Sequence, residues 1–221
     1  MSPTTATATR RPSRSRPSAA ERRRRQVVRR RRRVVLAAVA VGLVVVGVIV
    51  GLPVARKAVN ELGLPLRYQD VIRQQAAAKH LDPAFVAAVI YAETKFDART
   101  SSAGAVGLMQ ILPQTAQFLA HRSGATSFHV SDLSTPQVNI AYGSYYLRYL
   151  LDEYDNNKVL ALAAYNGGES NVDGWVAASR ARRTRFRIDD IPFPETRAYV
   201  ERVLGAQRQY RQTYATQLGY R

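Results

Sequence analysis

Residues 93–115 read ETKFDARTSSAGAVGLMQILPQT, and this stretch determines how the rest of the chain is interpreted. One carboxylate, that of Glu93, precedes a loop of small residues and glycines, and the pair Met109 and Gln110 follows the loop. Pro113 then favours the start of a helix, because proline is preferred at the first helical position. A single acid held beside a backbone loop and an amide side chain suits an enzyme that protonates a glycosidic oxygen and binds a sugar.

The sequence around this stretch predicts a small helical domain. From residue 66 onward the apolar residues follow helical spacing, and the polar–apolar alternation of a half-buried strand is almost absent. Asp82 and Pro83 have the residue types of an N-cap and a first helical position. We expect helices over residues 67–80, 83–94, 113–124, 136–154, 158–165 and 194–214. Such helices with short connections predict one all-α domain.

Glu93 is expected on the inward face of the helix over 83–94. It follows Val89 by four residues and therefore shares a face with it. The same face carries Phe85, Val86 and Ile90. Burial and the negative end of the helix dipole both disfavour an ionised carboxylate, so the pKa of Glu93 should be raised, as a general acid requires. A structural salt bridge with Arg99 or Arg197 is the alternative.

Two further blocks carry candidate polar residues. AAYNGG places Tyr165 and Asn166 where an apolar helix runs into glycines. The phenol can donate a hydrogen bond to a sugar or to Glu93, while an Asn-Gly helix end is the structural alternative. PETRAYV places Glu195 in the first turn of a helix, where an acid is favourable in any case.

In this order, the three blocks resemble those of the lytic transglycosylases of the soluble (SLT) type, a family with a lysozyme-like domain that cuts peptidoglycan. The resemblance spans residues 67–210, about two thirds of the chain. It implies that Glu93 acts first as acid and then as base, while the C6 hydroxyl of the substrate attacks C1. The MurNAc–GlcNAc β-1,4 bond would then yield a 1,6-anhydromuramoyl product without consuming water. No other acid in the sequence makes a persuasive nucleophile of the kind that most glycosidases use.

The resemblance also assigns substrate-binding residues. Met109 and Gln110 take the positions of the family's Met-Gln pair, where the thioether would pack on a sugar and the amide would bind an N-acetyl group. Tyr165 with Asn166 takes the position of the motif tyrosine and its neighbour. Glu195 takes that of a second acid, which in the family helps to hold the site or the substrate.

The loop after Glu93 departs from the family pattern. Ser101 takes the position of the motif serine, but the interval from the glutamate is one residue shorter than in many members. Ser102 is therefore an alternative, and for either serine simple capping of the loop is the structural alternative. Thr94 replaces the usual serine after the glutamate and keeps a hydroxyl.

The formal net charge of +17 is concentrated before the predicted domain. Residues 1–57 carry 15 Lys and Arg against one acid, whereas the remaining residues carry 18 against 15. We expect residues 1–33, which are rich in Arg, Ser and Pro, to form a disordered tail. A nucleic-acid partner is disfavoured, because the folded domain is close to neutral.

Residues 34–55 form an uncharged run of 22 residues. As a helix this run would measure roughly 33 Å and cross a bilayer. A cleaved signal peptide is the alternative, but the run is long and no convincing cleavage site follows. The 13 arginines before the run predict a cytoplasmic N terminus. The chain would then be a single-pass bacterial membrane protein, with a linker at 56–65 and an extracytoplasmic catalytic domain at 66–221.

The residue inventory also bears on cofactors and partners. The chain has no cysteine, which excludes disulfides and thiolate metal sites, and its three histidines lack the spacing of metal ligands. We expect no cofactor, and a peptidoglycan glycan strand as the partner; membership of a cell-envelope complex stays open. A lysozyme that uses water and a non-catalytic wall-binding module remain as alternative functions.

Overall fold

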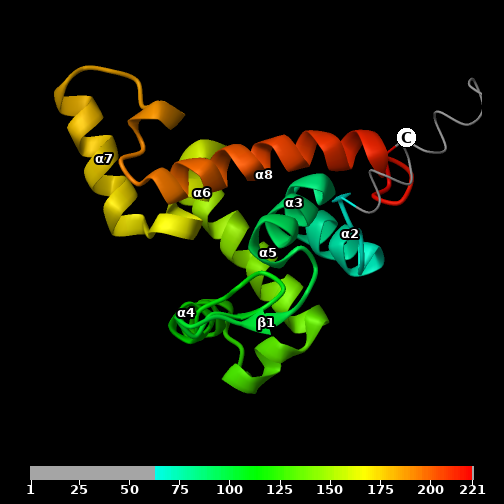
Figure 1. The fold of residues 1–221 in the computed structure, drawn as a ribbon. Helices are drawn as coiled ribbons and strands as arrows, with labels where there is room; N and C mark the ends of the chain where they lie inside the picture. The colour runs from blue at the N-terminus through cyan, green and yellow to red at the C-terminus, as the bar shows by residue number, and fades with distance from the viewer. Residues whose placement is uncertain (1–62, 221) are drawn as a thin grey trace, which may run out of the picture. The chain divides into compact units, whose positions relative to one another are not determined.

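The computed structural model describes residues 63–220 (Figure 1). The predicted tail (1–33), the predicted span (34–55) and most of the predicted linker (56–65) lie outside these residues. None of the helices within 63–220 has the length and apolar character that crossing a bilayer requires.

Helices make up most of the described part of the chain, as predicted. The α-helices are α2 (Gln69–Ala78), α3 (Pro83–Thr94), α4 (Pro113–Ser123), α5 (Pro136–Glu153), α6 (Lys158–Gly167), α7 (Glu169–Ala181) and α8 (Pro194–Thr213). Two short 3-10 helices are η1 (Val130–Ser134) and η2 (Ile188–Asp190), and two short strands are β1 (Arg99–Thr100) and β2 (Val106–Gly107). Every predicted helix is present, with ends within about two residues of the expected ones.

Local chemistry sets the ends of these helices. The Asp82 carboxylate accepts a hydrogen bond of 2.9 Å from the backbone N–H of Ala84, which confirms the predicted N-cap of α3. Asn157 caps α6 in the same way through Val159. α4 ends at Gly124, whose φ of 73° lies in the left-handed region that glycine adopts without strain.

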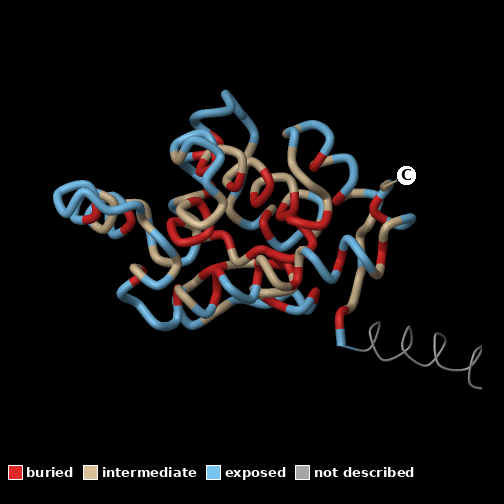
Figure 2. The backbone as a smooth tube through the Cα atoms, turned by 90° about the horizontal axis from the view of Figure 1, so that it is seen from above, coloured by how far each residue is buried: buried red, intermediate tan, exposed pale blue. Residues whose placement is uncertain are grey.

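α3 is the central helix of the described domain. Each residue from 84 to 90 is at most 1% exposed, so this part of the helix is buried on all sides and not on a single apolar face as expected. α8 runs along α3, and α2 packs against it from another side (Figure 1). Figure 2 shows the buried residues gathered where the helices meet, with exposed residues along the outer turns and loops.

The strands β1 and β2, the helix α7 and the two 3-10 helices were not predicted. β1 and β2 pair antiparallel, with Arg99 opposite Gly107 and Thr100 opposite Val106. Strands of two residues are too short to show an alternating pattern, which explains why the sequence analysis found no strand. α7 has buried residues only at Val172 and Ser179, so its sequence lacks the apolar stripe that identifies a helix.

Candidate active site

Glu93 lies in the last turn of α3, and its side chain is half-buried. The two residues that follow the helix, Lys95 and Phe96, have φ values of 53° and 65°, which turn the chain away from the helix axis and toward β1. The Arg99 guanidinium donates to the backbone carbonyl of Glu93 at 3.0 Å. Within residues 63–220 the Glu93 carboxylate belongs to no ion pair, so neither Arg99 nor Arg197 forms the alternative salt bridge.

The environment of Glu93 favours a carboxyl group that keeps its proton. Burial raises the pKa of Glu93 to about 7, although the nearby Tyr199 hydroxyl and the charges of Arg202 and Arg99 act in the opposite direction. A group with this pKa is populated in both protonation states near neutral pH. It can therefore give up a proton in one step and accept one in the next.

α8 brings a tyrosine to Glu93 that the sequence analysis had not assigned. The Tyr199 hydroxyl is buried, and it has no hydrogen bond of regular geometry to any described group although it interacts with the Glu93 carboxyl. Burial, with the negative charge of Glu93 second, raises the pKa of Tyr199 well above its usual value, so the phenol stays a donor. The available signal was spacing, because Tyr199 follows Glu195 by one helical turn.

Gln110 bridges the hairpin that β1 and β2 form. Its side-chain Nε2 donates to the backbone carbonyls of Arg99 and Gly107, each at 2.8 Å. Gln110 itself has a φ of 49°, an uncommon conformation for a residue with a β-carbon. Its amide oxygen accepts no hydrogen bond from the described residues, so this oxygen can receive one from a ligand.

Asn139, on α5, fixes the backbone of the same loop. Its Oδ1 accepts from the backbone N–H of Met109 at 2.8 Å, and its Nδ2 donates to the carbonyls of Val106 and Leu133 at 2.9 and 3.0 Å. The side chain is fully buried. Sequence reasoning missed this residue, since an asparagine near the start of a helix gives no sign of contacts this distant in the chain.

The Met109 side chain lies in the core and is 0% exposed. It packs against α5 at Gly143, where an added β-carbon would lie 2.3 Å from the methionine sulfur. In this structure the thioether is therefore covered by protein and does not present a surface to a sugar. The backbone carbonyl of Met109 instead accepts the hydrogen bond from Tyr165.

Tyr165 joins the AAYNGG block to the loop. Its hydroxyl donates to the Met109 carbonyl at 2.8 Å, and its ring lies 5.2 Å from that of Tyr146. Burial raises the pKa of Tyr165 well above its usual value, and the charge of Glu93 raises it further. This electrostatic coupling to Glu93 means that the structure brings together residues from two of the predicted blocks.

Ser101 and Ser102 differ in their contacts. The Ser101 hydroxyl accepts a hydrogen bond of 3.0 Å from the backbone N–H of Ala105, and its backbone pairs with the same residue. Ser101 thus caps the turn between β1 and β2, which is the structural alternative given above. Ser102 is exposed.

Asn166 and Glu195 lie on the exposed surface. The Asn166 Oδ1 accepts from the Thr196 hydroxyl at 2.8 Å, which ties the end of α6 to the start of α8. Glu195 stands in the first turn of α8, next to this contact.

A cavity of about 270 Å³ collects several predicted residues. Gln110, Tyr165 and Asn166 line it together with Gln114, Thr115 and Tyr146. Glu93 does not line this cavity, but it is coupled to Tyr165, which does. In the part of the chain that the structure describes, no three acidic or histidine side chains gather as a metal site would require.

Comparison with known proteins gives consistent matches. The family described as "Transglycosylase SLT domain" matches residues 70–187. The soluble lytic murein transglycosylase of Escherichia coli (strain K12) is 33% identical over 150 residues, covering 66% of this chain. The membrane-bound lytic murein transglycosylase C of Glaesserella parasuis serovar 5 is 27% identical over 167 residues.

Solved structures show the same similarity. An inactive Glu-to-Gln variant of the lytic transglycosylase Slt from Pseudomonas aeruginosa matches with a TM-score of 0.65 and 31% identity, over 71% of this chain and 26% of that one. The 70-kDa soluble lytic transglycosylase of Escherichia coli matches with a TM-score of 0.65 and 31% identity, over 73% of this chain and 28% of that one. The chain spans only 23% of the curated E. coli relative and 46% of the G. parasuis relative.

Proposed function

Because the chain belongs to the transglycosylase SLT domain family, we propose that it is a murein lytic transglycosylase that cleaves the MurNAc–GlcNAc β-1,4 bond of peptidoglycan. The observation that carries this proposal is the half-buried Glu93 with a pKa raised to about 7, next to a tyrosine that lines a cavity. The relatives named lytic murein transglycosylases support the same substrate class.

In this mechanism Glu93 is the single acid and base. Its proton goes to the glycosidic oxygen as the bond from C1 to that oxygen breaks, and the GlcNAc hydroxyl leaves. The resulting carboxylate then takes the proton of the MurNAc C6 hydroxyl, whose oxygen forms the new bond to C1. The product carries a 1,6-anhydro ring, the proton count balances, and no water is consumed.

The surrounding groups suit this sequence of steps. Burial raises the pKa of Tyr199, so its hydroxyl can donate a hydrogen bond while Glu93 is ionised. The Tyr165 hydroxyl donates to the Met109 carbonyl and so holds the loop beside Glu93. Arg202 and Arg99 supply positive charge that offsets part of the burial penalty on the carboxylate. We assign the Gln110 amide oxygen to an N-acetyl N–H, and we assign Asn166 and Glu195 to the exposed edge of the substrate-binding site. For Met109 and Ser101 we propose that they shape the loop that receives the sugar.

We also propose that residues 34–55 anchor the enzyme in the bacterial membrane, with residues 1–33 in the cytoplasm and residues 66–221 outside. The length of the uncharged run and the 13 arginines before it support this topology. Relatives of both kinds exist, some named soluble and others membrane-bound.

Product analysis tests the proposed activity. Purified protein should release anhydromuropeptides from murein sacculi, identified by mass spectrometry. Glu93→Gln should reduce the rate by at least about 10²-fold, as loss of a general acid does. Glu201→Gln, the same change at an exposed position of α8, is the matched control and should keep full activity.

Two other outcomes would reject the proposal. Products that carry only reducing ends would identify a lysozyme that uses water. Equal binding of murein by wild type and Glu93→Gln, with no cleavage by either, would identify a wall-binding module.

A further inference from the structure

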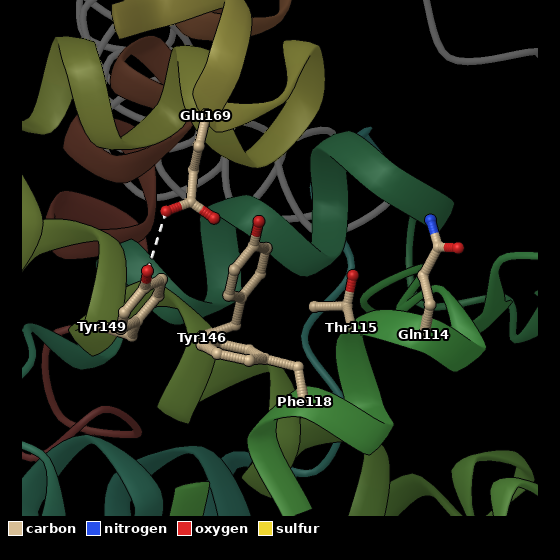
Figure 3. Close-up of a pocket in the computed structure, with 6 residues that line it drawn as sticks. All are labelled: Gln114, Thr115, Phe118, Tyr146, Tyr149 and Glu169. Carbon is tan, nitrogen blue, oxygen red and sulfur yellow. Dashed lines mark hydrogen bonds between the residues drawn. The ribbon is translucent and has the colours of Figure 1, made fainter. Parts of the chain in front are cut away.

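A second cavity, of about 260 Å³, continues from the first. The two cavities share Gln114, Thr115 and Tyr146, so a ligand that fills the first can extend into the second. The second is completed by Phe118, Tyr149 and Glu169, which come from α4, α5 and the start of α7 (Figure 3). None of these three residues has a role in the reaction proposed above.

Aromatic rings form the apolar part of this second cavity. Phe118 is 43% exposed, which is unusual for a phenylalanine and leaves its ring open to a ligand. Its centroid lies 5.3 Å from that of Tyr149, and the Tyr146 and Tyr149 rings are stacked at 6.2 Å. The guanidinium of Arg122 lies 5.0 Å above the Tyr149 ring. The protein therefore already places one cation on an aromatic face at this site.

Glu169 is the charged group of the cavity. One of its oxygens accepts a hydrogen bond of 2.9 Å from the Tyr149 hydroxyl, and Figure 3 shows the carboxylate pointing toward the hydroxyl ends of Tyr149 and Tyr146. The other oxygen has no hydrogen-bond partner among residues 63–220, and no described Lys or Arg forms an ion pair with Glu169. Glu153 and Asp173 are close enough to act on it electrostatically.

These neighbours determine which ligand would gain most from the cavity. Burial raises the pKa of Glu169, the hydrogen bond from Tyr149 acts in the opposite direction, and the negative charges of Glu153 and Asp173 raise the pKa further. A neutral sugar would leave the Glu169 carboxylate without an ion-pair partner in the described part of the chain. A cation would compensate it directly and would also gain from contact with aromatic faces.

We propose that this second cavity binds a primary ammonium group carried by the murein strand, with Glu169 as its counter-ion and Phe118 and Tyr149 as its aromatic walls. The inference rests on the proposed function, because the strand must occupy the first cavity to reach the second. Two parts of murein can carry such a group: the side chain of a diamino acid in a stem peptide, and a glucosamine that lacks its acetyl group. Both present the same chemistry to Glu169.

Binding measurements can test this inference separately from cleavage. The full chain with Glu93→Gln keeps the strand intact, and soluble murein strands are titrated against it before and after acetylation of their amines. Free-amine strands should bind about tenfold more tightly than acetylated strands. Adding Glu169→Gln should remove this preference and leave the affinity for acetylated strands unchanged. Adding Glu201→Gln, an exposed Glu-to-Gln change elsewhere, should keep the preference.

Two further strand preparations identify the source of the amine. Strands that are fully N-acetylated on the sugars carry the amine only in the peptide, and partly deacetylated strands without peptides carry it only on the sugar. The preparation that retains the Glu169-dependent preference carries the amine that the cavity binds. Thermal melting of the variant checks that the fold is kept. Should Glu169→Gln not fold, Glu153→Gln, an exposed change that lowers the same negative potential, should reduce the preference in part.

Equal binding of free-amine and acetylated strands would overturn the inference, and so would a preference that survives both Glu169→Gln and Glu153→Gln. Absence of binding by either strand would overturn it as well. Cleavage of acetylated strands by wild type tests the proposed transglycosylase activity alone. Failure of the proposed activity can therefore be distinguished from failure of the proposed ammonium site.

Discussion

A β-carbon added to Gly107 would lie 2.2 Å from the side-chain amide nitrogen of Asn139. Real β-carbons do not approach other atoms this closely, so the residue at 107 must lack one. Gly107 also has a φ of 82°, a left-handed backbone conformation that favours glycine over residues with a β-carbon. The close approach lets Asn139 reach three backbone groups of the loop and of η1, and this contact positions the loop that follows Glu93.

Gly107→Ala should therefore be severely destabilising. The added methyl group clashes with Asn139, and moving the asparagine leaves buried backbone groups without partners, so we expect a loss of about 3 kcal/mol or more in the free energy of unfolding. Gly124→Ala is the matched control, because Gly124 has a similar φ of 73° but open space around the added carbon. It should cost about 1 kcal/mol. Similar losses in the two variants, measured by denaturant unfolding, would show that the contact with Asn139 is unimportant.

Tyr165→Phe should impair cleavage more than stability. The change removes the hydrogen bond to the Met109 carbonyl, which positions the loop that follows Glu93, so we expect kcat to fall by about 10- to 100-fold while the fold survives. Tyr210→Phe is the control, because the Tyr210 hydroxyl also donates to a backbone carbonyl, that of Pro65. Tyr210 is not among the residues that line either cavity. Rates of murein cleavage that fall equally in both variants would count against a role for Tyr165 in the reaction.

The fold was largely predictable because its signals are local. Pro83, Pro113 and Pro194 mark the starts of helices, and Gly124 marks an end. The raised pKa of Glu93 followed from two local facts, its helix position and its apolar neighbours. These two facts are sufficient to predict the direction of the pKa shift.

The rest of the site depends on contacts between distant parts of the chain. Asn139 reaches the loop from α5, and nothing in its own sequence neighbourhood indicates this contact. Tyr199 reaches Glu93 from α8, and its spacing from Glu195 is the only local signal. For Met109 the family resemblance implied a sugar contact, but the packing against α5 at Gly143 places the side chain in the core. The hydrogen bond from Ala105 to Ser101 likewise depends on the pairing of β1 with β2, and strands of two residues are too short to be predicted from the sequence.

The pH dependence of cleavage should follow the protonation of Glu93. With a pKa of about 7, the group is protonated below neutral pH and loses its proton above it. In free enzyme the first step needs the protonated form, so kcat/KM should fall about tenfold for each pH unit above roughly 8. Rates measured on soluble strands from pH 5 to 10 check this. A profile that is flat through this range would mean that Glu93 is not the acid.

Asp82 should stabilise the helix that carries Glu93. Burial alone would raise the pKa of Asp82, but hydrogen bonds from Tyr220, Gln207 and the Ala84 N–H, with the charge of Arg211, hold it below its usual value. A lowered pKa means that the stabilisation is present above the unfolded pKa of about 4 and is lost as the pH falls through the folded one. Asp82→Ala should thus cost about 2–4 kcal/mol at pH 7, and less at pH 3.

The control for this change is Asp70→Ala on α2. Asp70 is exposed and forms a 2.5 Å ion pair with Arg73, and exposed pairs of this kind contribute little. Its loss should change the free energy of unfolding by less than about 1 kcal/mol. Denaturant unfolding at pH 7 and pH 3 compares the two, and an Asp82→Ala effect that is constant with pH would contradict the assigned pKa shift.

Glu93 should reduce stability while it serves catalysis. Its pKa is 4.5 in the reference state and about 7 in the fold, so the folded protein binds the proton more tightly. Stability relative to a neutral side chain is then highest below pH 4.5 and is lost as the pH rises toward 7, by an amount on the order of 3 kcal/mol. Glu93→Gln removes the charge, so the variant should be more stable than wild type at pH 8 and close to it at pH 4.5, whereas Glu201→Gln should show no such divergence. Equal unfolding curves for Glu93→Gln and wild type at pH 8 would mean that the fold does not penalise the ionised carboxylate, and the physical basis for Glu93 as an acid would be gone.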